Sequence, residues 1–384
     1  MLDVWHFINS DSGGAARTVE NLVAAQAHLG LPSADRIRVT APAGLRLPVS
    51  VRLDQYVADR RIWGLNQWRF AAYAWWQMQT NHAARVSLLH THSFTFAAPD
   101  VHTVLGFYHA YWNRGFLPTA ISAHRRLSLH WIQYSLLTVL ERRVLKAAKE
   151  VVFASSQNRE YAEAALNVRR PGHAHVILPG VDTSLYNPGR RARLASERQA
   201  SFPELDCKRR WLLFVGHDFI GKGLLRLLRA LAGRCQSGDW LLLVFGHDPR
   251  NLAAAQAEVN QACNDRVRFL GADRRLPTAF GLGDMLLMDS VSEGFPLVLL
   301  EAMAAGCVPV VNTFGGVSDV IDDGVNGFVR ESAEEIVSQA LSTDTDRLHE
   351  MSARSVQSGG ARTWDIVAHE YAEVYKVVRG QRVS

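Results

Sequence analysis

Short apolar runs that alternate with helix-period segments constrain the fold of this chain more than any other feature of its sequence. Each run has the length of a strand and is followed by turn residues and then by apolar residues at helical spacing. Strands alternating with helices are typical of parallel sheets built from βαβ units. The expected strands are residues 4–8, 36–40, 86–90, 101–107, 150–154 and 175–178 in the first half, and residues 211–215, 240–245, 267–270, 285–288 and 308–312 in the second.

A polar and charged stretch, residues 187–210, separates the two series of strands. We therefore expect two doubly wound domains, residues 1–188 and residues 189–361. The last stretch, residues 362–384, has a helix pattern that by spacing alone could pack on either domain.

Charge is unevenly placed along the chain. The 384 residues hold 42 Lys and Arg against 37 Asp and Glu, and residues 1–188 hold 19 against 12, so the first half is the basic half. Within residues 111–149, seven basic side chains accompany Glu141 alone and are interleaved with Trp and Tyr. Such a pattern suits an anionic membrane surface or a phosphorylated substrate, and it also fits a solvated basic face over core aromatics.

Two further features indicate the compartment. No uncharged apolar run is long enough to span a bilayer, and the N-terminus enters a strand pattern without the basic and apolar regions of a signal peptide. We therefore expect an unprocessed, cytoplasmic protein. The four cysteines have no CxxC spacing, which predicts reduced thiols and neither a zinc site nor a disulfide framework; they are Cys207, Cys235, Cys263 and Cys307.

Two glycine-rich loops each follow an expected strand and precede an expected helix. Gly13 and Gly14 allow backbone N–H groups to approach an anion at a helix N-terminus, and residues 216–223 place Lys222 among three glycines. Ligands of doubly wound sheets bind at the carboxyl ends of the strands, where both loops lie. Neither loop is a GxGxxG or P-loop motif. A phosphate cradle is thus one interpretation of each loop, beside an ordinary turn or an exposed lysine.

The histidines lie near strand ends. His90 and His92 share one face of a strand, but no Asp or Glu lies within several residues of them, so we do not favour a metal site there. His109 follows the next strand and could hydrogen-bond a substrate hydroxyl. The one DxD sequence, residues 344–346, lies in a helical segment, and we expect no metal cofactor.

A pair of glutamates frames a nearly all-apolar helix at residues 293–301, with the sequence EGFPLVLLE. Pro296 fits the first turn of a helix, so the backbone N–H groups from Phe295 onward would be free to bind a ligand. Glu301 is the only charged residue from 295 to 305, and a buried carboxylate needs a partner. A pair of vicinal hydroxyls would serve, and Glu293 could then contact the group beyond the phosphates.

These motifs together resemble the retaining glycosyltransferases of family 4, which have the GT-B fold of two Rossmann-like, doubly wound domains facing across a cleft. The resemblance covers nearly the whole chain. It is carried by the paired glutamates, by AMAAGCVPVV and GGVSDVIDDGVNGFV after them, by HVILPGVDTSLYNP, FVGHDFIGKG and RVRFLGAD, and by the early glycine pair. A narrower likeness, to the lipopolysaccharide-core enzymes of that family, is carried by VGHDFIGKG and the basic, aromatic N-terminal half.

The resemblance implies a role for each site residue. Glu301 would bind the nucleotide ribose and Glu293 the donor sugar, while Lys222 and the backbone at Gly14 would hold the diphosphate. His109 matches the histidine near the reacting centre, so His109, Glu293 and Lys222 are the expected catalytic residues. The expected donor-binding residues are Gly13, Gly14, His217, Lys222, Leu270, Gly294, Phe295, Pro296, Leu297, Val298 and Glu301. The helix around Trp364 would pack back on the first domain.

The resemblance also implies an activity: metal-independent transfer of a sugar, with retention, from a nucleotide diphosphate sugar to a lipid-linked or polysaccharide acceptor of the bacterial envelope. A UDP-sugar is the favoured donor. The protein would sit on the inner face of the cytoplasmic membrane and would not bind nucleic acid. The residues expected to face the acceptor or the membrane are Trp112, Arg114, Arg125, Arg126 and Trp131.

The chain departs from the family pattern beside the diphosphate. His217 and Gly221 stand where many relatives have arginine, so Arg17 or Arg226 would have to supply that charge. Two other functions remain open at this point: a GT-B nucleotide-sugar epimerase, and a non-catalytic scaffold that binds sugar nucleotide or membrane.

Overall fold

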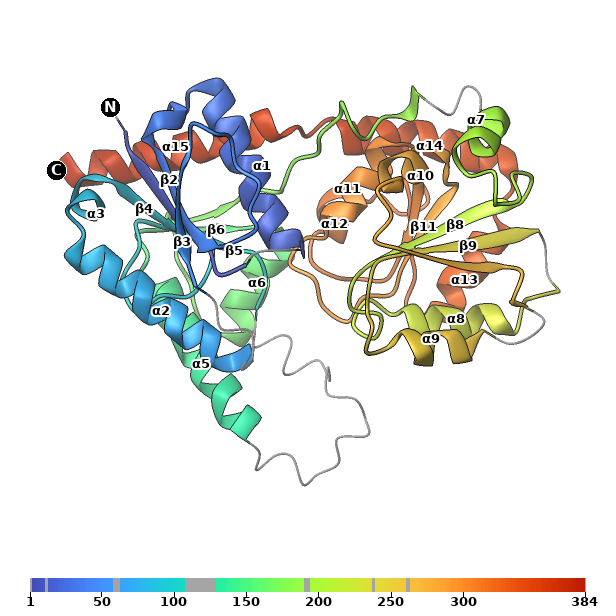
Figure 1. Ribbon diagram of the computed structural model, residues 1–384, viewed down its shortest axis with the longest axis horizontal. Coiled ribbons are helices and arrows are strands. Elements are labelled where there is room, and N and C mark those ends of the chain that lie inside the picture. Colours follow the sequence, from blue (N-terminus) through green and yellow to red (C-terminus); the bar gives the residue numbers. More distant parts are fainter. Residues whose placement is uncertain are drawn as a thin grey trace. The chain divides into compact units, whose positions relative to one another are not determined.

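The computed structural model describes residues 2–10, 13–57, 63–107, 129–189, 194–236, 239–259 and 263–383 (Figure 1). The chain divides into two compact units: an N-terminal unit of Met1–Gly180 with Trp364–Ser384, and a C-terminal unit of Val181–Thr363. The sequence predicted that the first domain ends at residue 188, whereas in the structure the first unit ends at Gly180 and the second begins at Val181. The C-terminal helix belongs to the N-terminal unit.

The N-terminal unit is built on a parallel sheet in the order β3-β2-β1-β4-β5-β6-β7. Its strands are β1 (Val4–Phe7), β2 (Ile37–Pro42), β3 (Arg52–Tyr56), β4 (Leu88–Thr91), β5 (Val101–Val104), β6 (Glu150–Phe153) and β7 (Ala174–Val176). Its helices are α1 (Gly13–Leu29), the 3-10 turn η1 (Ala34–Arg36), α2 (Trp63–Thr80), α3 (His82–Val86), α5 (Leu129–Ala147), α6 (Ser156–Ala165) and α15 (Trp364–Val383).

Side chains of the inner strand β1 point alternately to the two faces of this sheet, as the strand period requires. Trp5 and Phe7 pack in a cluster with Phe70 and Ala74 of α2. His6 points to the other face, where it contacts Gln26 of α1. Helices α1 and α15 lie side by side on that face (Figure 1).

The C-terminal unit has a second parallel sheet, in the order β10-β9-β8-β11-β12-β13. Its strands are β8 (Arg210–Val215), β9 (Trp240–Phe245), β10 (Val267–Gly271), β11 (Met285–Met288), β12 (Val308–Val311) and β13 (Phe328–Val329). Its helices are α7 (Leu194–Ser201), α8 (Leu224–Ala232), α9 (Leu252–Glu258), α10 (Leu276–Leu282), α11 (Leu297–Ala304), α12 (Val317–Val320), α13 (Ala333–Ser342) and α14 (Thr345–Gly360).

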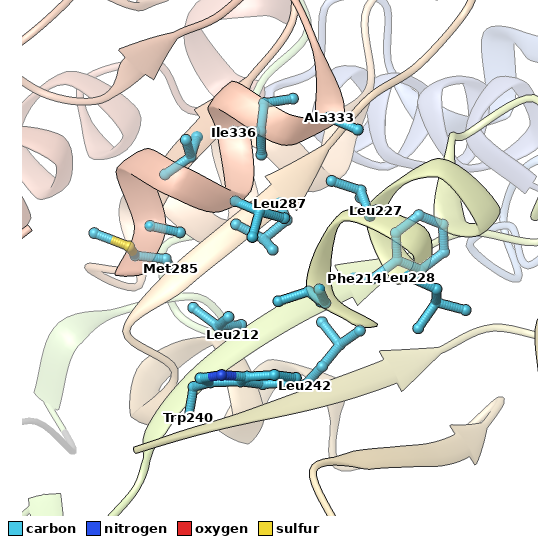
Figure 2. Close-up of a cluster of buried hydrophobic side chains, with 14 of the residues drawn as sticks. Leu212, Phe214, Leu227, Leu228, Trp240, Leu242, Met285, Leu287, Ala333 and Ile336 are labelled. Atoms are coloured by element: carbon cyan, nitrogen blue, oxygen red, sulfur yellow. The ribbon is translucent and has the colours of Figure 1, made fainter. Parts of the chain in front are cut away.

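One core cluster joins this sheet to α8 and α13 (Figure 2). The leucines of α8 recur at helical spacing, and Leu224, Leu227, Leu228 and Leu231 are all buried. They meet the side chains that β8, β9 and β11 present on the same face, among them Trp240, which is fully buried. The strands β9, β11 and β12 are buried at every residue and are apolar throughout, which is why continuous apolar runs marked them in the sequence.

The cysteines correct one prediction. Cys235 and Cys263 form a disulfide with their Cα atoms 5.3 Å apart, whereas the sequence predicted reduced thiols. Cys235 follows α8 and Cys263 precedes β10, and both lie in the cluster of Figure 2, so packing brings together two residues that no spacing motif links. Neither Cys207 nor Cys307 forms a disulfide within the described part of the chain.

Among the helices of the described residues, none is both long and apolar enough to cross a membrane.

Candidate functional site

The predicted donor-binding residues of the C-terminal unit gather where β8, β9 and β11 end, which is the ligand-binding edge of a doubly wound sheet. The loop after β8 carries His217 and Lys222, and the loop after β11 carries Glu293. Parallel strands end at the same edge, so residues far apart in sequence meet there.

Lys222 and Glu293 form an ion pair across this edge, although 71 residues separate them. The Lys222 side chain is 27% exposed and that of Glu293 is 10% exposed, so the pair is largely withdrawn from solvent. The alkyl chain of Lys222 lies over Gly216, where a Cβ would be 2.9 Å from its Cγ. A larger residue at position 216 would push the ammonium group away from Glu293.

Two glycines allow loops of this edge to approach each other closely. Gly223 begins α8 with φ +81°, and a Cβ there would lie 2.1 Å from the carbonyl oxygen of Asp289. Gly316 begins α12 with φ +91°, and a Cβ there would lie 2.2 Å from the ring of Phe295. Only glycine tolerates a positive φ at a position where a Cβ would overlap a neighbouring atom. Any other residue at these two positions would push the two loops apart.

A second carboxyl group, Asp218, lies beside the ion pair. Burial raises the pKa of Asp218, and the carboxylates of Asp248 and Glu293 act in the same direction, while the Gly221 N–H and the Lys222 ammonium oppose them. Asp218 therefore binds a proton more readily than an exposed aspartate does. This limits the negative charge that gathers beside Lys222.

Arg226, one of the two cations predicted to replace the family arginine, lies on α8 and donates hydrogen bonds to the carboxylate and to the carbonyl oxygen of Asp289. Asp289 thus neutralises much of its charge. The other candidate, Arg17, lies in α1 of the N-terminal unit. His217 accepts a hydrogen bond at Nδ1 from the backbone N–H of His247, 3.1 Å away.

Glu301 lies in the second turn of α11 and is 3% exposed. The helix begins at Leu297 directly after Pro296, and the Leu299 N–H donates to the carbonyl oxygen of Pro296, 3.0 Å away. The N–H groups of Leu297 and Val298 precede any acceptor within the helix. The loop between β11 and α11 holds Gly294, Phe295 and Pro296, and the first turn of α11 holds Val298. Leu270 lies in the edge strand β10. Each of these predicted residues is therefore at or near the carboxyl edge of the sheet.

Two buried polar groups of this edge were not predicted from the sequence. Asn312, just after β12, donates a hydrogen bond to the carbonyl oxygen of Ser290, 2.9 Å away. Its own Oδ1 and the Oγ of Ser290 have no hydrogen-bond partner in the described part of the chain. Asn312 directly follows β12 and Ser290 lies two residues after the end of β11, and that position after an apolar strand was the only signal that could have identified them.

In the N-terminal unit, Gly13 and Gly14 open α1 directly after residues 11–12, which lie outside the described part. Gly13 has φ +78°, and an added Cβ at either glycine would meet no atom within 4 Å. Gly13 is thus required by its backbone conformation, and the space around both glycines is open. The predicted residues His109, Trp112, Arg114, Arg125 and Arg126 lie outside the described residues, as does the side chain of Trp131 in α5.

A cluster of buried histidines occupies the centre of the N-terminal sheet. His6 of β1 and His90 of β4 are paired neighbours, His92 directly follows β4, and His102 lies on β5. Burial lowers the pKa of His6 and of His102 to about 4. Burial also lowers the pKa of His90 and His92 well below the usual value, and the neighbouring histidines add to the effect. All four rings are therefore neutral at pH 7.

A cavity of about 460 Å³ opens beside this cluster, within the N-terminal unit. His92 and His102 line it, together with Asn9 and Gln67 and with Glu141 of α5, which is 1% exposed. Cavities of this size are typical of small-molecule sites. The unit thus holds a second candidate site, separate in sequence from the Lys222 and Glu293 pair.

Comparison with known proteins gives this arrangement a family context. The family model described as Glycosyltransferase Family 4 matches residues 12–185, and the model described as Glycosyl transferases group 1 matches residues 209–346. A curated D-inositol 3-phosphate glycosyltransferase of Corynebacterium kroppenstedtii is 28% identical over 221 residues, which are 54% of this chain and 48% of that protein. The chain spans about half the length of the first curated relatives that it matches.

Solved structures show the same architecture. WaaG, a glycosyltransferase involved in lipopolysaccharide biosynthesis, aligns with a TM-score of 0.74 at 20% identity over 97% of this chain and 99% of that one. HepE of Anabaena, in complex with UDP and glucose, aligns with a TM-score of 0.70 at 17% identity over 98% and 100%. The expected fold class, two Rossmann-like domains with parallel sheets as in GT-B proteins, is confirmed.

Proposed function

Because the chain belongs to the family 4 glycosyltransferases, we propose that it transfers a sugar, with retention, from a nucleotide diphosphate sugar to a lipid-linked or polysaccharide acceptor of the cell envelope. The observation that supports donor binding is the ion pair of Lys222 and Glu293 beside α11. A cation, a carboxylate and a helix N-terminus at one edge match the three parts of such a donor: diphosphate, sugar hydroxyls and nucleotide.

Each donor-site residue has a distinct role in this proposal. The ammonium of Lys222 has three N–H donors, so it can bind a diphosphate oxygen while it keeps its bond to Glu293. Glu293 accepts from a hydroxyl of the donor sugar, and Glu301 accepts from the two ribose hydroxyls. A UDP-sugar is the donor we favour, with support from the complex of HepE, a protein of similar fold, with UDP and glucose.

The proposed reaction needs no metal. The acceptor oxygen bonds to the anomeric carbon as the bond from that carbon to the diphosphate oxygen breaks, and the acceptor proton passes to the leaving diphosphate on the same face. Lys222 and the N–H groups at the start of α11 stabilise the charge that develops on the leaving group. His109, by its place in the sequence, would contact the donor sugar near the reacting centre.

The test of the donor site is a binding titration with UDP-, GDP-, ADP- and dTDP-sugars, followed by a measurement of nucleotide release. We expect Lys222→Gln to weaken binding of the preferred donor about 10- to 150-fold, because it removes a hydrogen bond to a charged group. Lys376→Gln is the matched control, since Lys376 is 70% exposed and pairs with the equally exposed Glu373. Glu301→Ala should also weaken binding.

Three outcomes would contradict the proposal. If Glu301→Ala left donor binding and stability unchanged, Glu301 would not be the residue that binds the ribose hydroxyls. Recovery of an epimerised free nucleotide sugar would identify an epimerase instead. Absence of binding to all four donors would favour a scaffold.

We also propose that the N-terminal unit binds the inner face of the cytoplasmic membrane. The described part of α5 presents a solvent-facing stripe at helical spacing, with Leu136 and Val139 followed by Arg143 and Lys146. Leu136 is 49% exposed and Val139 is 62% exposed, so the stripe presents two apolar side chains to solvent next to its two cations. Apolar groups that insert between lipid headgroups and cations that meet their phosphates are the two requirements of a peripheral site.

Liposome co-sedimentation tests this surface. Vesicles with anionic lipid should retain the protein, and Val139→Glu combined with Lys146→Glu should release it. Leu185→Ser is the control, because Leu185 is an exposed apolar residue of the C-terminal unit, 51% exposed. If neutral and anionic vesicles retained equal amounts of the protein, the proposed membrane surface would be refuted.

A further inference from the structure

The two carboxyl oxygens of Asp218 have different surroundings. Asp218 lies in the loop between β8 and α8, which also carries Lys222, and it is half-buried. Its Oδ1 accepts a hydrogen bond from the Gly221 N–H, 2.9 Å away. Its Oδ2 has no hydrogen-bond partner in the described part of the chain. A proton that binds to this carboxyl group would therefore sit on Oδ2, where it is available as a hydrogen-bond donor.

Two further carboxyl groups act on Asp218 from neighbouring loops. Asp248 follows β9 and accepts two hydrogen bonds, one of them from the backbone N–H of Phe219, 2.9 Å away. Glu293 follows β11 and is paired with the ammonium of Lys222. Asp218 has a single backbone N–H, and burial together with the two neighbouring carboxylates raises its pKa. Of the three, Asp218 is thus the carboxyl group placed to take up a proton.

A bound diphosphate would add to the negative charge of this cluster. Three carboxyl groups already act beside the one ammonium of Lys222. A diphosphate, like a carboxylate, only accepts hydrogen bonds, so the two can lie close together only when a cation or a proton lies between them. Lys222 already pairs with Glu293, and Arg226 of α8 is held by Asp289. A proton on Oδ2 would supply the bridge that these cations do not.

His217 is the other group of this loop that could take up a proton. Its Nδ1 accepts from the backbone N–H of His247, 3.1 Å away, so the neutral ring carries its proton on Nε2. A second proton would have to bind at Nδ1 and would break that hydrogen bond. Protonation of Asp218 breaks no bond, because Oδ1 can keep its contact with the Gly221 N–H.

We propose that Asp218 takes up a proton when a nucleotide diphosphate sugar binds, and that its Oδ2–H then donates to a diphosphate oxygen. The inference rests on the proposed function, since it concerns the same donor site. No bond of the donor breaks in this step. One proton moves from water or buffer to Oδ2, so the complex holds one proton more than its separate partners.

The binding of the proton and the binding of the donor strengthen each other by the same factor. A negatively charged ligand raises the pKa of a neighbouring carboxyl group, so the affinity for the donor rises as the pH falls. The uptake of one proton changes this affinity by at most about tenfold per pH unit. The effect disappears at a pH so high that Asp218 stays ionised in the complex as well.

Asp218→Asn mimics the protonated carboxyl group. The amide oxygen can accept from the Gly221 N–H, and the amide nitrogen donates from the position of Oδ2. We expect this variant to bind the donor about three- to tenfold more tightly than the wild type at pH 7.5, because it need not take up a proton. Its affinity should no longer change with pH.

Two further variants serve as controls. Asp206 precedes β8 at the other end of the strand, and its Oδ1 also accepts from a backbone N–H, that of Lys208, 3.0 Å away. Asp206→Asn should therefore leave the donor affinity and its pH dependence as they are in the wild type. His217→Gln removes the other group that could bind the proton, and the pH dependence should persist in it.

Isothermal titration calorimetry in two buffers with different enthalpies of ionisation counts the protons that are taken up. UDP-glucose is the first probe, to be replaced by whichever of the four nucleotide sugars binds best. Its diphosphate carries no proton that titrates near pH 7, unlike UDP, whose terminal phosphate has a second pKa of about 6. The wild type should take up a fraction of one proton that grows as the pH is lowered from 7.5 to 6, and Asp218→Asn should take up none.

Four results would overturn the inference: no proton uptake by the wild type, uptake that persists in Asp218→Asn, uptake that only His217→Gln abolishes, or weaker donor binding by Asp218→Asn at every pH. If the donor binds and Lys222→Gln weakens it, but no proton is taken up, the donor site stands and this inference alone fails. Absence of binding to all four donors would refute both.

Discussion

Lowering the pH from 7.5 to 5 should destabilise the N-terminal unit selectively, because its buried histidines must stay neutral to remain in place. His6 and His102 have a pKa of about 4 when folded and 6.5 when exposed. Between these values the unfolded chain binds more protons than the folded one, so the free energy of unfolding falls as the pH falls. This stability is fully present above pH 6.5 and is lost as the pH falls toward 4.

The magnitude follows from the two pKa values. At pH 5 each exposed histidine is 1.5 pH units below its pKa, which at about 1.4 kcal/mol per unit amounts to about 2 kcal/mol per residue. His6 and His102 together contribute about 4 kcal/mol, and His90 and His92 act in the same direction. A loss of this size is a large share of the 5–15 kcal/mol that is typical of a folded domain.

Two groups packed against the cluster, Tyr375 and Gln26, do not offset this effect. Burial raises the pKa of Tyr375 on α15, so that hydroxyl keeps its proton throughout the range, and Gln26 on α1 does not titrate. Glu141 of α5 lines the same cavity as His92 and His102.

Hydrogen exchange at a series of urea concentrations, corrected for the intrinsic rate at each pH, measures the two units separately. Peptides of β1, β4 and β5 should lose protection as the pH falls, and peptides of β8 and β9 serve as the internal reference, since no described histidine of the C-terminal unit is buried. In His102→Gln the pH-dependent loss should shrink by about 2 kcal/mol. An unfolding free energy of the N-terminal unit that stays constant from pH 7.5 to 5 would refute the reasoning.

Three further substitutions have expected outcomes that urea unfolding can measure. Asp284→Ala should destabilise the C-terminal unit by about 3–5 kcal/mol, because it leaves Arg198 as a buried unpaired cation. The Arg198 side chain is 5% exposed and lies 2.7 Å from the Asp284 carboxylate. A change below about 1 kcal/mol would count against a buried pair. Gly316→Ala should lower both stability and donor binding, because its Cβ would overlap the ring of Phe295, and unaltered donor affinity would show that this contact does not shape the pocket. Tyr375→Phe should cost about 1–3 kcal/mol in the N-terminal unit by leaving His90 and Gln26 without their shared partner, and a neutral effect would argue against a structural role for these two hydrogen bonds.

The sequence identified the strands that are buried at every residue, such as β9, β11 and β12. Runs such as residues 240–245 are continuous and apolar, and the structure has β9 over the same residues. Strand β3 was missed because it lies at the edge of its sheet, where Arg52 and Gln55 face solvent and no apolar run forms. Strand β13 was missed because two residues are too short to show any period.

The candidate site was predictable where topology alone brings residues together. Lys222 and Glu293 each follow a strand, and parallel strands end at one edge. His6 was not identified, because its proximity to His90 depends on which strands are neighbours and in what register. The partnerless oxygens of Ser290 and Asn312 likewise become visible only when burial and hydrogen bonds are known.

The place of α15 in the chain has a consequence for how the protein is made. Tyr371 and Tyr375 complete the hydrogen bonds of Thr103, His90 and Gln26, yet the ribosome adds them after the whole C-terminal unit. Residues 2–180 must therefore wait, with an unfinished interior, while residues 181–363 are synthesised and can fold. We expect the order of folding to reverse the order of synthesis, with the N-terminal unit closing last and relying on chaperones meanwhile.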